Sequence, residues 1–279
     1  MANTIGYGQG AVNNTNGWGK SATNNTIDFG EVCADSWSPE TNLVGGSSFS
    51  NTYSTDYDGI DAYISTDSTY SELDGQTKAT FSMWVKPSAS GISQILTSTI
   101  RNITSNNFQH LIRTDINERI RFFKSTTSDY TYSNANVLNI GQWNHVMICV
   151  DLSQPTTSLR CRIFVNNVDE TSGFVNLSTT AFDTSIDALY IGENQNGDFT
   201  PFLGNIDEVA IWSGTDLRND VATIYNSGVP NNLNDNGLTA PTSWYRFEEG
   251  NGTTIADSGS STNNATIQNS VTFETDVPT

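Results

Sequence analysis

Hydrophobic and polar residues alternate along short runs in the middle of the chain, which is the pattern of β-strands that bury one face. The run Ala79–Lys86 places Phe81, Met83 and Val85 on the same side. Comparable runs are Phe108–Arg113, Arg119–Lys124, Trp143–Asp151, Leu159–Val165, Ala188–Gly192 and Ile206–Trp212. Because clusters of Asn, Gly, Asp and Ser separate these runs, we expect an all-β fold in which many short strands form a two-sheet antiparallel sandwich.

One stretch has the spacing of a helix instead, which predicts a short helix over residues 216–226. Thr215 is placed to cap its start and Gly228 to end it. The apolar stripe of this helix would consist of Leu217, Val221, Ile224 and Tyr225. After a linker, residues 243–275 return to strand character.

A Gly/Asn-rich repeat opens the chain. Tyr7, Trp18 and Phe29 recur every eleven residues, each followed by glycine, and the first two copies continue to Asn-Asn-Thr. A unit this small cannot bury its ring alone, so it needs a neighbouring copy, the main domain or another chain. A flexible tail is the alternative, but a tail has no use for periodic aromatic residues. We therefore predict an assembly segment whose contacts are made by Tyr7, Trp18, Phe29 and Trp37.

These patterns divide the chain into an N-terminal repeat arm (1–46), a sandwich (47–230) and a C-terminal segment (231–279), whose strands are expected to complete the same sandwich. Cys33, Cys149 and Cys161 cannot form a disulfide framework, so three free thiols are expected.

The charge of the chain excludes two classes of partner. Twelve Lys and Arg residues against 30 Asp and Glu give 279 residues a formal net charge of −18. Such a chain does not bind nucleic acid by neutralising phosphates or dock on an anionic membrane surface. Membrane insertion is not expected either, because no apolar run approaches the ~20 residues that a spanning helix needs.

Six motifs follow one another over residues 56–228, and together they resemble a known family. They are Tyr57–Ile64, Phe81–Pro87, Gly141–Val146, Ile163–Asn167, Leu189–Gly192 with Gly204–Trp212, and the helix end Ile224–Gly228. In this order they resemble the laminin-G-like, concanavalin A-like lectin and glucanase domains. The resemblance implies a two-sheet jelly roll of about a dozen strands.

The segment Trp244–Asp257 departs from the family's order, because it resembles a part that usually precedes the domain. Either it supplies the missing first strand from the C-terminal side, as in a circular permutation, or it begins a truncated second copy. With Gly/Asn repeats upstream, this layout resembles virion structural proteins of tailed bacteriophages.

Catalysis is not expected. Glycosidases of this fold carry paired carboxylates on one strand, and the nearest pair here is Asp207-Glu208. Adjacent strand residues point to opposite faces, so these two could not flank one bond. His145 lies in a strand and is interpreted as structural.

A structural Ca²⁺ ion is one of two open interpretations of three carboxylates. Asp58 and Asp61 lie in an Asp-Gly-x-Asp turn, and Asp207 shares strand parity with Val209 and Ile211. Oxygen ligands from such loops suit Ca²⁺, and the resemblance implies it, since relatives often bind this ion. Alternatively, these carboxylates accept backbone hydrogen bonds in turns.

Sugar sites combine aromatic faces with amides and carboxylates, and several loops carry both. The candidates are Tyr130, Tyr132, Asn134, Asn136, Asn194, Asn196, Asp198 and Phe199. Alternatively, these residues indicate no sugar site, because the loops of this chain are rich in Asn and Tyr in general. Seven of the 12 basic residues also fall between Arg101 and Arg162, where they could pair with carboxylates of this chain, an acidic neighbour or a glycan.

The leading hypothesis is a non-enzymatic virion surface protein of a bacteriophage: a head-decoration, fibre or tail-associated subunit. The chain starts without a basic residue before Lys20 and without an apolar stretch, so no Sec-type signal is expected, and release by host lysis would bring the protein outside. The arm would bind other virion proteins within a homo-oligomer, for which we favour a trimer, and the jelly roll would face host glycans. The alternatives are a carbohydrate-binding module of a secreted adhesin or polysaccharide-degrading enzyme, and a glycosidase.

Overall fold

The structure of the protein is a computed structural model, and it describes most of the chain. The described ranges are 5–7, 16–18, 49–66, 70–102, 105–125, 127–184, 188–193 and 200–279, with the backbone alone for 5–7, 16–18, 100–102 and 105–108. The chain divides into two compact units, Met1–Ser50 and Asn51–Thr279. Within the described ranges, no helix is long and apolar enough to cross a membrane.

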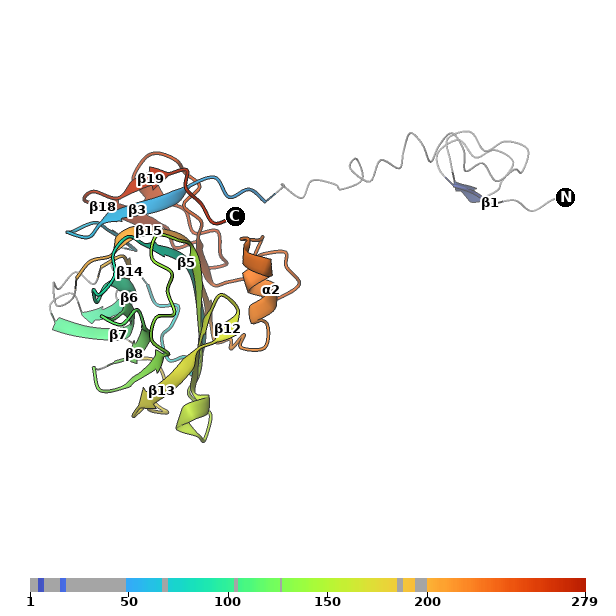
Figure 1. Cartoon of the computed structure of the whole chain (residues 1–279). Coiled ribbons are helices and arrows are strands. Elements are labelled where there is room, and N and C mark those ends of the chain that lie inside the picture. Colours follow the sequence, from blue (N-terminus) through green and yellow to red (C-terminus); the bar gives the residue numbers. More distant parts are fainter. Residues whose placement is uncertain are drawn as a thin grey trace. The chain divides into compact units, whose positions relative to one another are not determined.

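Two antiparallel sheets pack face to face in the larger unit (Figure 1). The first has the spatial order β12 (Val168–Asp169), β11 (Cys161–Val165), β10 (Asn144–Asp151), β5 (Lys78–Pro87), β15 (Leu203–Ser213), β3 (Ser54–Asp58) and β19 (Thr272–Glu274), with β16 (Ser243–Tyr245) also paired to β15. The second has the order β13 (Thr171–Val175), β9 (Tyr130–Ser133), β8 (Ile120–Lys124), β7 (Ser105–Thr114), β6 (Ile95–Asn102), β14 (Ala188–Ile191), β4 (Tyr63–Ser65), β18 (Ala265–Gln268) and β17 (Thr254–Ile255). This architecture confirms the predicted all-β jelly-roll sandwich.

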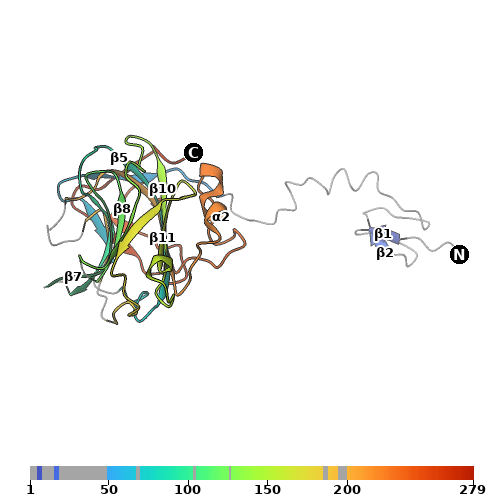
Figure 2. The ribbon, with the colours of Figure 1, turned by 60° about the horizontal axis from the view of Figure 1, so that its bottom comes forward.

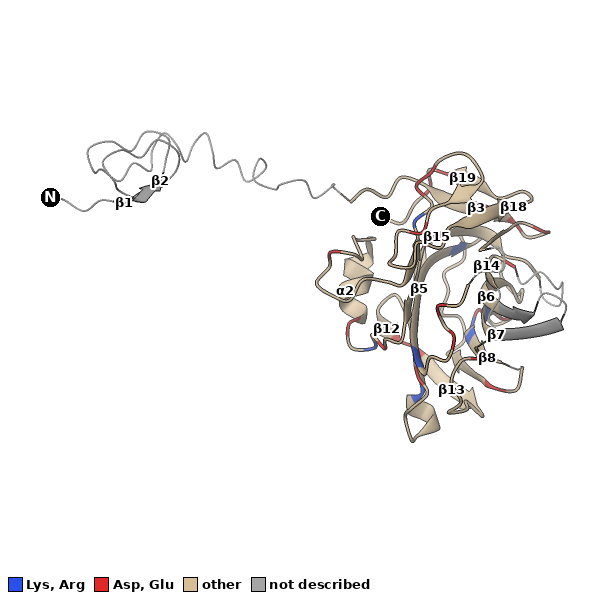
Figure 3. Cartoon of the chain, turned by 180° about the vertical axis from the view of Figure 1, so that it is seen from behind, with Lys and Arg blue, Asp and Glu red and all other residues tan. Residues whose placement is uncertain are grey.

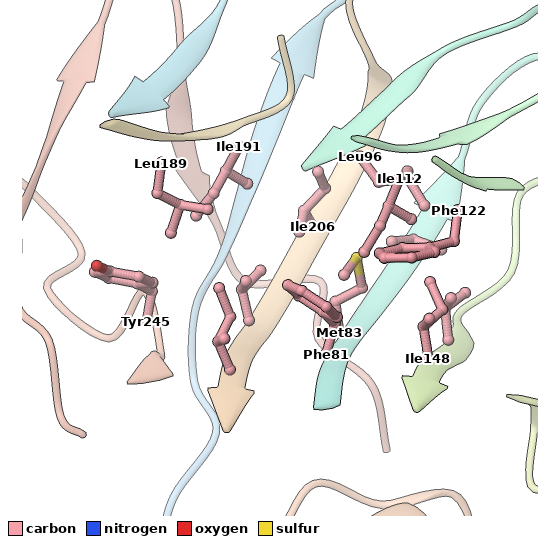
Figure 4. Packing of buried hydrophobic residues seen from close by; sticks show 14 of the residues in the cluster. Phe81, Met83, Leu96, Ile112, Phe122, Ile148, Leu189, Ile191, Ile206 and Tyr245 are labelled. Atoms are coloured by element: carbon pink, nitrogen blue, oxygen red, sulfur yellow. The ribbon is translucent and has the colours of Figure 1, made fainter. Parts of the chain in front are cut away.

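The core lies between the two sheets, as Figure 4 shows. Phe81, Met83 and Val85 of β5 all point into it, as their alternation predicts, and none is more than 1% exposed. Ile112 and Phe122 reach the same core from the second sheet. Burial of these inner faces fixes the register of β5, β7 and β8, since a shift by one residue would turn their apolar side chains outward.

Strands from the end of the chain belong to both sheets. In the first sheet, β16 pairs with β15 and β19 pairs with β3; in the second, β18 pairs with β4. Tyr245 and Phe247 of this segment are fully buried in the main core. The segment after residue 230 is therefore part of the sandwich that the middle of the chain forms.

In the smaller unit, β1 (Ile5–Tyr7) and β2 (Asn16–Trp18) pair in parallel. Ile5 lies opposite Asn16, and Tyr7 lies opposite Trp18. The offset between the partners equals the eleven-residue repeat, so equivalent positions of two copies stand side by side. Phe29 and Trp37 lie outside the described residues.

The helix is shorter than the sequence predicts: α2 covers Val221–Tyr225, not residues 216–226. Side-chain bonds hold the preceding segment in a different conformation. Asp216 accepts hydrogen bonds from the backbone N–H and the guanidinium of Arg218, and the backbone N–H of Leu217 donates to the hydroxyl of Thr80. These bonds tie residues 216–218 to β5 and to a local turn. Asn226, in the left-handed conformation, ends the helix; η1 (Thr157–Leu159) and η2 (Asn226–Gly228) are short 3₁₀ turns.

The helix covers the outer face of the first sheet (Figures 1 and 2). Tyr225 stacks on Trp84, with ring centroids 5.9 Å apart, and also contacts the ring of His145. His145 Nε2 is 2.8 Å from the hydroxyl of Ser82. Burial lowers the pKa of His145 to about 3, so this histidine is neutral, which agrees with its interpretation as a structural residue.

Asp207 and Glu208 do not point to opposite faces, and this corrects the prediction from strand alternation. A bulge in β15 shifts the register between Asp207 and Ala210, and Glu208 has a φ of 52°. Asp207 lies opposite Trp84, and Glu208 lines a small hollow with Trp84, so both lie on the helix side of the sheet. A bulge places two residues where regular pairing has one. Asp207 therefore does not point to the core side, whereas Val209 and Ile211 do.

Both carboxyl groups are buried and held by protein groups. The indole N–H of Trp244 donates to Glu208 at 2.5 Å, and Arg246 lies 3.4 Å from the same carboxyl group. The side-chain amide of Asn51 donates to Asp207 at 2.9 Å. Burial raises the pKa of Glu208 to about 8, although the charge of Arg246 lowers it. Burial and the charge of Glu208 raise the pKa of Asp207.

A chain that ends at residue 230 should not fold, whereas a chain that begins at residue 49 should. The first deletion removes the partners of β15, β4 and β3 and opens the core where Tyr245 and Phe247 lie. We expect no cooperative thermal transition for residues 1–230 and a transition close to that of the full chain for residues 49–279, both followed by circular dichroism. A full-strength transition for residues 1–230 would show that the C-terminal strands are dispensable.

Stability should fall as the pH rises from about 6.5 to 8. Between the unfolded value of 4.5 and the folded value of about 8, Glu208 keeps its proton only in the folded state, so folding takes up a proton that is lost at higher pH. The decrease should be on the order of 1 kcal/mol per pH unit. The range lies above the ordinary histidine pKa of 6.5, so the buried histidines contribute little to it.

Urea unfolding at several pH values measures this slope. Glu208→Gln keeps an acceptor for Trp244 but cannot titrate, and its slope should be clearly smaller than that of the unchanged protein. Glu274→Gln, at an exposed position of β19, is the matched control and should retain the slope. Equal slopes for all three proteins would contradict the assignment.

Candidate functional site

The second sheet has an outer face that no described helix covers, and its side chains are identified by register. Ile112 and Phe122 lie opposite each other and point into the core. Their neighbours Leu111 and Phe123, also a cross-strand pair, must therefore point outward. Together with Ile95 they form a separate apolar cluster, on which Tyr130 packs.

Arginine and tyrosine side chains alternate across this outer face. Arg121 of β8 pairs with Tyr132 of β9, and Phe123 pairs with Tyr130. The guanidinium carbons lie over the rings at 5.0 Å for Arg113 on Phe123, 5.3 Å for Arg119 on Tyr132, and 5.5 Å for Arg121 on Tyr130. We call this set of residues the tyrosine–arginine face: Arg113, Arg119, Arg121, Phe123, Tyr130 and Tyr132. Each cation–π contact of this kind contributes about 0.5–1 kcal/mol and holds a long side chain in one pose.

Gly173 lets Tyr132 lie across the neighbouring edge strand. The two residues are cross-strand partners next to a bulge in β13. A Cβ atom added at Gly173 would stand 2.4 Å from the hydroxyl oxygen of Tyr132 and 2.5 Å from Cζ, which is closer than any real contact. The ring of Tyr132 therefore occupies the space in which the side chain of any residue other than glycine at position 173 would lie. Arg119 packs on this ring.

The tyrosine–arginine face is a local excess of positive charge in an acidic protein. Figure 3 marks the basic positions in blue, among them those on β7 and β8. One carboxylate oxygen of Asp115, Oδ2, lies 2.8 Å from both Nε and Nη2 of Arg121 and forms an ion pair with it. Burial and the charge of Arg121 lower the pKa of Arg113, while Asp115 raises it. Among the described residues, Asp115 is thus in direct contact with Arg121.

The guanidinium group of Arg119 has donors that the described residues do not use. Arg119 donates to the carbonyl of Ser133 at 3.3 Å, and Arg113 donates to the carbonyl of Thr114 at 3.1 Å. The guanidinium of Arg119 carries five N–H donors, and its bond to the carbonyl of Ser133 uses one of them. Planar donors in fixed positions match the geometry of a carboxylate or a sulfate.

The structure brings together some of the predicted sugar-binding residues. Tyr130 and Tyr132 lie side by side, with ring centroids 6.0 Å apart. Asn134 continues from β9 to the rim, where its amide donates to Glu170 at 2.8 Å. The structure places Asn136 in the same loop, where its backbone N–H donates to the carbonyl of Asn117. The remaining predicted residues, Asn194, Asn196, Asp198 and Phe199, lie outside the described residues.

The three predicted Ca²⁺ ligands are not gathered at one place. One oxygen of Asp58 accepts the backbone N–H groups of Ile60, Asp61 and Ala62. Asp207 is buried four residues along β15 from the position opposite Asp58, which corresponds to about 13 Å. Within the described part of the chain, no group of three His, Cys, Asp or Glu residues is arranged as a metal site. These residues do not fit a single Ca²⁺ ion, and a Ca²⁺ site stays a prediction.

The sequence contained signals for the parts of the face that were not predicted. Arg119, Arg121 and Phe123 are spaced by two, as are Tyr130 and Tyr132, which is the signature of one strand face. The sequence does not reveal that these runs are neighbours or that Arg113 joins them from β7. The glycine at position 173, inside a strand, indicates that another group approaches the backbone closely there. The sequence does not indicate that this group is Tyr132.

Comparisons with known proteins agree with this fold. A solved structure from Bacteroides ovatus, described as a "putative carbohydrate binding protein", has a TM-score of 0.56 and 17% identity, covering 82% of this chain and 62% of that one. This chain thus spans less than two thirds of that protein. A heptameric SAP-like pentraxin from Limulus polyphemus has a TM-score of 0.47 and 15% identity, covering 62% and 82% of the two chains.

The Ruminococcus gnavus sialidase CBM40 bound to α2,3-sialyllactose has a TM-score of 0.46 and 15% identity, covering 62% of this chain and 98% of that one. No curated protein matches the chain. The sequence profile of one family matches residues 58–222, which is more than half of the chain. With six motifs in order and two antiparallel sheets around one core, the chain belongs to the concanavalin A-like lectin/glucanases superfamily.

Proposed function

We propose that this protein binds an acidic carbohydrate on the tyrosine–arginine face. The observation that carries the proposal is the gathering of three guanidinium groups on aromatic rings, in a chain whose formal net charge is −18. Membership of the lectin and glucanase superfamily supports carbohydrate as the class of ligand. The local excess of positive charge supports a ligand with carboxylate or sulfate groups.

The two kinds of side chain would do different work on such a ligand. The guanidinium groups of Arg113, Arg119 and Arg121 form charge-assisted hydrogen bonds with acidic substituents, and these bonds are stronger than neutral ones. Tyr130 and Tyr132 offer rings that pack against the apolar C–H faces of sugar units and hydroxyls that bond at the rim. Because the cation–π contacts already order the arginine side chains, little entropy is lost on binding.

We propose binding rather than hydrolysis because the carboxylate pair that the fold offers is closed off. Asp207 and Glu208 are at most 3% exposed, and Trp244, Arg246 and Asn51 occupy their oxygens. The hollow beside Glu208 measures about 10 Å³, which is room for about one water molecule. A glycosidic bond cannot reach these groups in this conformation.

Affinity electrophoresis of the full chain in polygalacturonate, with neutral galactan as the comparison, tests the binding. We expect retardation in the acidic polymer only, weakening with salt because the contacts are partly exposed charges. Arg119→Gln and Tyr132→Ala should each weaken binding about tenfold, the equivalent of ~1.4 kcal/mol.

Arg162→Gln is the matched control, since it removes the same charge from β11 of the other sheet, where Arg162 lies 3.9 Å from Asp169. This variant should bind like the unchanged protein. Equal retardation in both polymers, or equal weakening by Arg162→Gln and Arg119→Gln, would refute the site.

We further propose the finer role of a bacteriophage virion surface subunit, with the arm (1–46) as its attachment and oligomerisation segment. The parallel pairing of β1 and β2 at the repeat offset supports this role, because Tyr7 and Trp18 are paired positions and equivalent positions of repeats pair when the repeats stack. A carbohydrate-binding module of a secreted adhesin or enzyme is the competing role, and in it the arm would be a linker.

The two roles differ in what the arm does in solution. We expect the full chain to form a closed homo-oligomer, a trimer by preference, and residues 49–279 to be monomeric, as measured by light scattering after size exclusion. Trp18→Ala should weaken the oligomer without changing the melting temperature of the sandwich. An unchanged oligomer after removal of the arm would make the arm a linker.

A further inference from the structure

A second hollow of about 450 Å³ lies at the end of β7 and β8, away from the tyrosine–arginine side chains. The polar side chains on its wall are Gln109, Lys124, Ser125, Ser178, Thr180, Asp183 and Thr184. Its volume falls within the range of about 300–1,000 Å³ that is typical of small-molecule sites. Thr180 is exposed at its rim, so the hollow is open to solutes.

The wall of this hollow is held in place without a ligand. Phe182 is anchored in the main core, and its backbone N–H and carbonyl bond to Gln76 and Gly75 at 2.8 and 3.0 Å. On the other side, the backbone N–H of Ser178 donates to the carboxylate of Asp129 at 3.2 Å. The segment between Ser178 and Phe182 is thus fixed at both ends, which keeps the cost of ordering on binding small.

A buried ammonium group faces this hollow. Lys124 is opposite His110, which packs on the core residue Phe81, so Lys124 points to the inside of the sandwich end and is only 2% exposed. Its ammonium donates one hydrogen bond, to the hydroxyl of Ser178 at 3.0 Å. Within the described part of the chain no carboxylate forms a direct ion pair with it; Asp129 and Asp183 act on its charge from further away.

An ammonium group has three N–H donors, and a buried charge is costly unless it is compensated by partners. Two donors of Lys124 are therefore available to a group that enters the hollow. The amide oxygen of Gln109 is already engaged with the backbone N–H of Asp183 and the hydroxyl of Ser125, which positions these wall residues.

We propose that this hollow is a binding site for a single neutral sugar unit, separate from the tyrosine–arginine face. A cation and a carboxylate, Lys124 and Asp183, both line it, so a ligand with net charge gains little. Neighbouring hydroxyls of a sugar match this pair, because one accepts from the ammonium and the other donates to the carboxylate. The hydroxyls of Ser125, Ser178 and Thr180 can donate or accept and would bond the remaining groups. The inference does not depend on the binding of acidic carbohydrate elsewhere.

Titration of the ¹⁵N-labelled full chain with glucose, galactose, mannose and N-acetylglucosamine, one at a time, tests the site by NMR. At least one of these sugars should shift the backbone amide signals of Ser178, Thr180 and Asp183. Lys124→Met, of similar length but without charge, should weaken that binding at least tenfold, the factor that corresponds to one lost hydrogen bond to a charged group.

A second variant covers the case in which Lys124→Met does not fold. Thr180→Tyr, at the exposed rim, should block the hollow and abolish the shifts while leaving the melting temperature unchanged. Arg119→Gln is the control on the other face and should bind the sugar normally, so that failure of this site and failure of the acidic-carbohydrate site are distinguishable. The proposal is overturned if none of the four sugars shifts these signals, or if a folded Lys124→Met or Thr180→Tyr protein binds as the unchanged protein does.

Discussion

The pairing of β15 is the constraint on which the rest of the sandwich depends. Along one edge this strand pairs with β5, and along the other it pairs first with β3 and then with β16. It thus joins the first strand of the domain and the C-terminal segment in one sheet. Because core residues of the two strands are cross-strand partners, as Ile206 and Val85 are, its register also fixes which face of β5 meets the second sheet.

The bulge in β15 carries a free-energy cost, because it buries two carboxyl groups. It turns Asp207 and Glu208 to the same side and buries both carboxyl groups. Two buried acids side by side are unfavourable when both are ionised, so the raised pKa values mean that at least one keeps its proton. Trp244 and Arg246 supply the partners, and both come from the C-terminal segment. The carboxyl pair and the returning strand therefore depend on each other.

The sequence was sufficient for the fold and only partly sufficient for the site. Alternation identified β5 and its core residues because one buried face leaves a clear pattern. It failed at Asp207, since a bulge changes the side of a residue without changing the hydrophobic pattern. It also overextended the helix, because residues 216–218 bond to Thr80 and to each other, and such bonds depend on a strand that is distant in sequence.

The same limit applies to the tyrosine–arginine face. Tyr130 and Tyr132 were identifiable because both residues lie in one short run, whereas Arg113 joins them only through the order of β7, β8 and β9. Lys124 gave no signal at all, since a lysine at the end of a strand is normally solvated. Its position in the hollow beside Ser178 depends on a segment that is distant in sequence.

The two outer faces of the sandwich differ in a way that bears on function. On the first sheet, Trp84 and His145 are covered by Tyr225 of the helix. The contacts on this face therefore stabilise the fold. On the second sheet, aromatic rings are covered by arginine side chains of the same sheet. Such a cover can be shared with a ligand, because a guanidinium stacked on a ring still has its in-plane donors. This cover of aromatic rings by cations, in a chain otherwise dominated by acids, supports the proposal that anionic groups bind at that face.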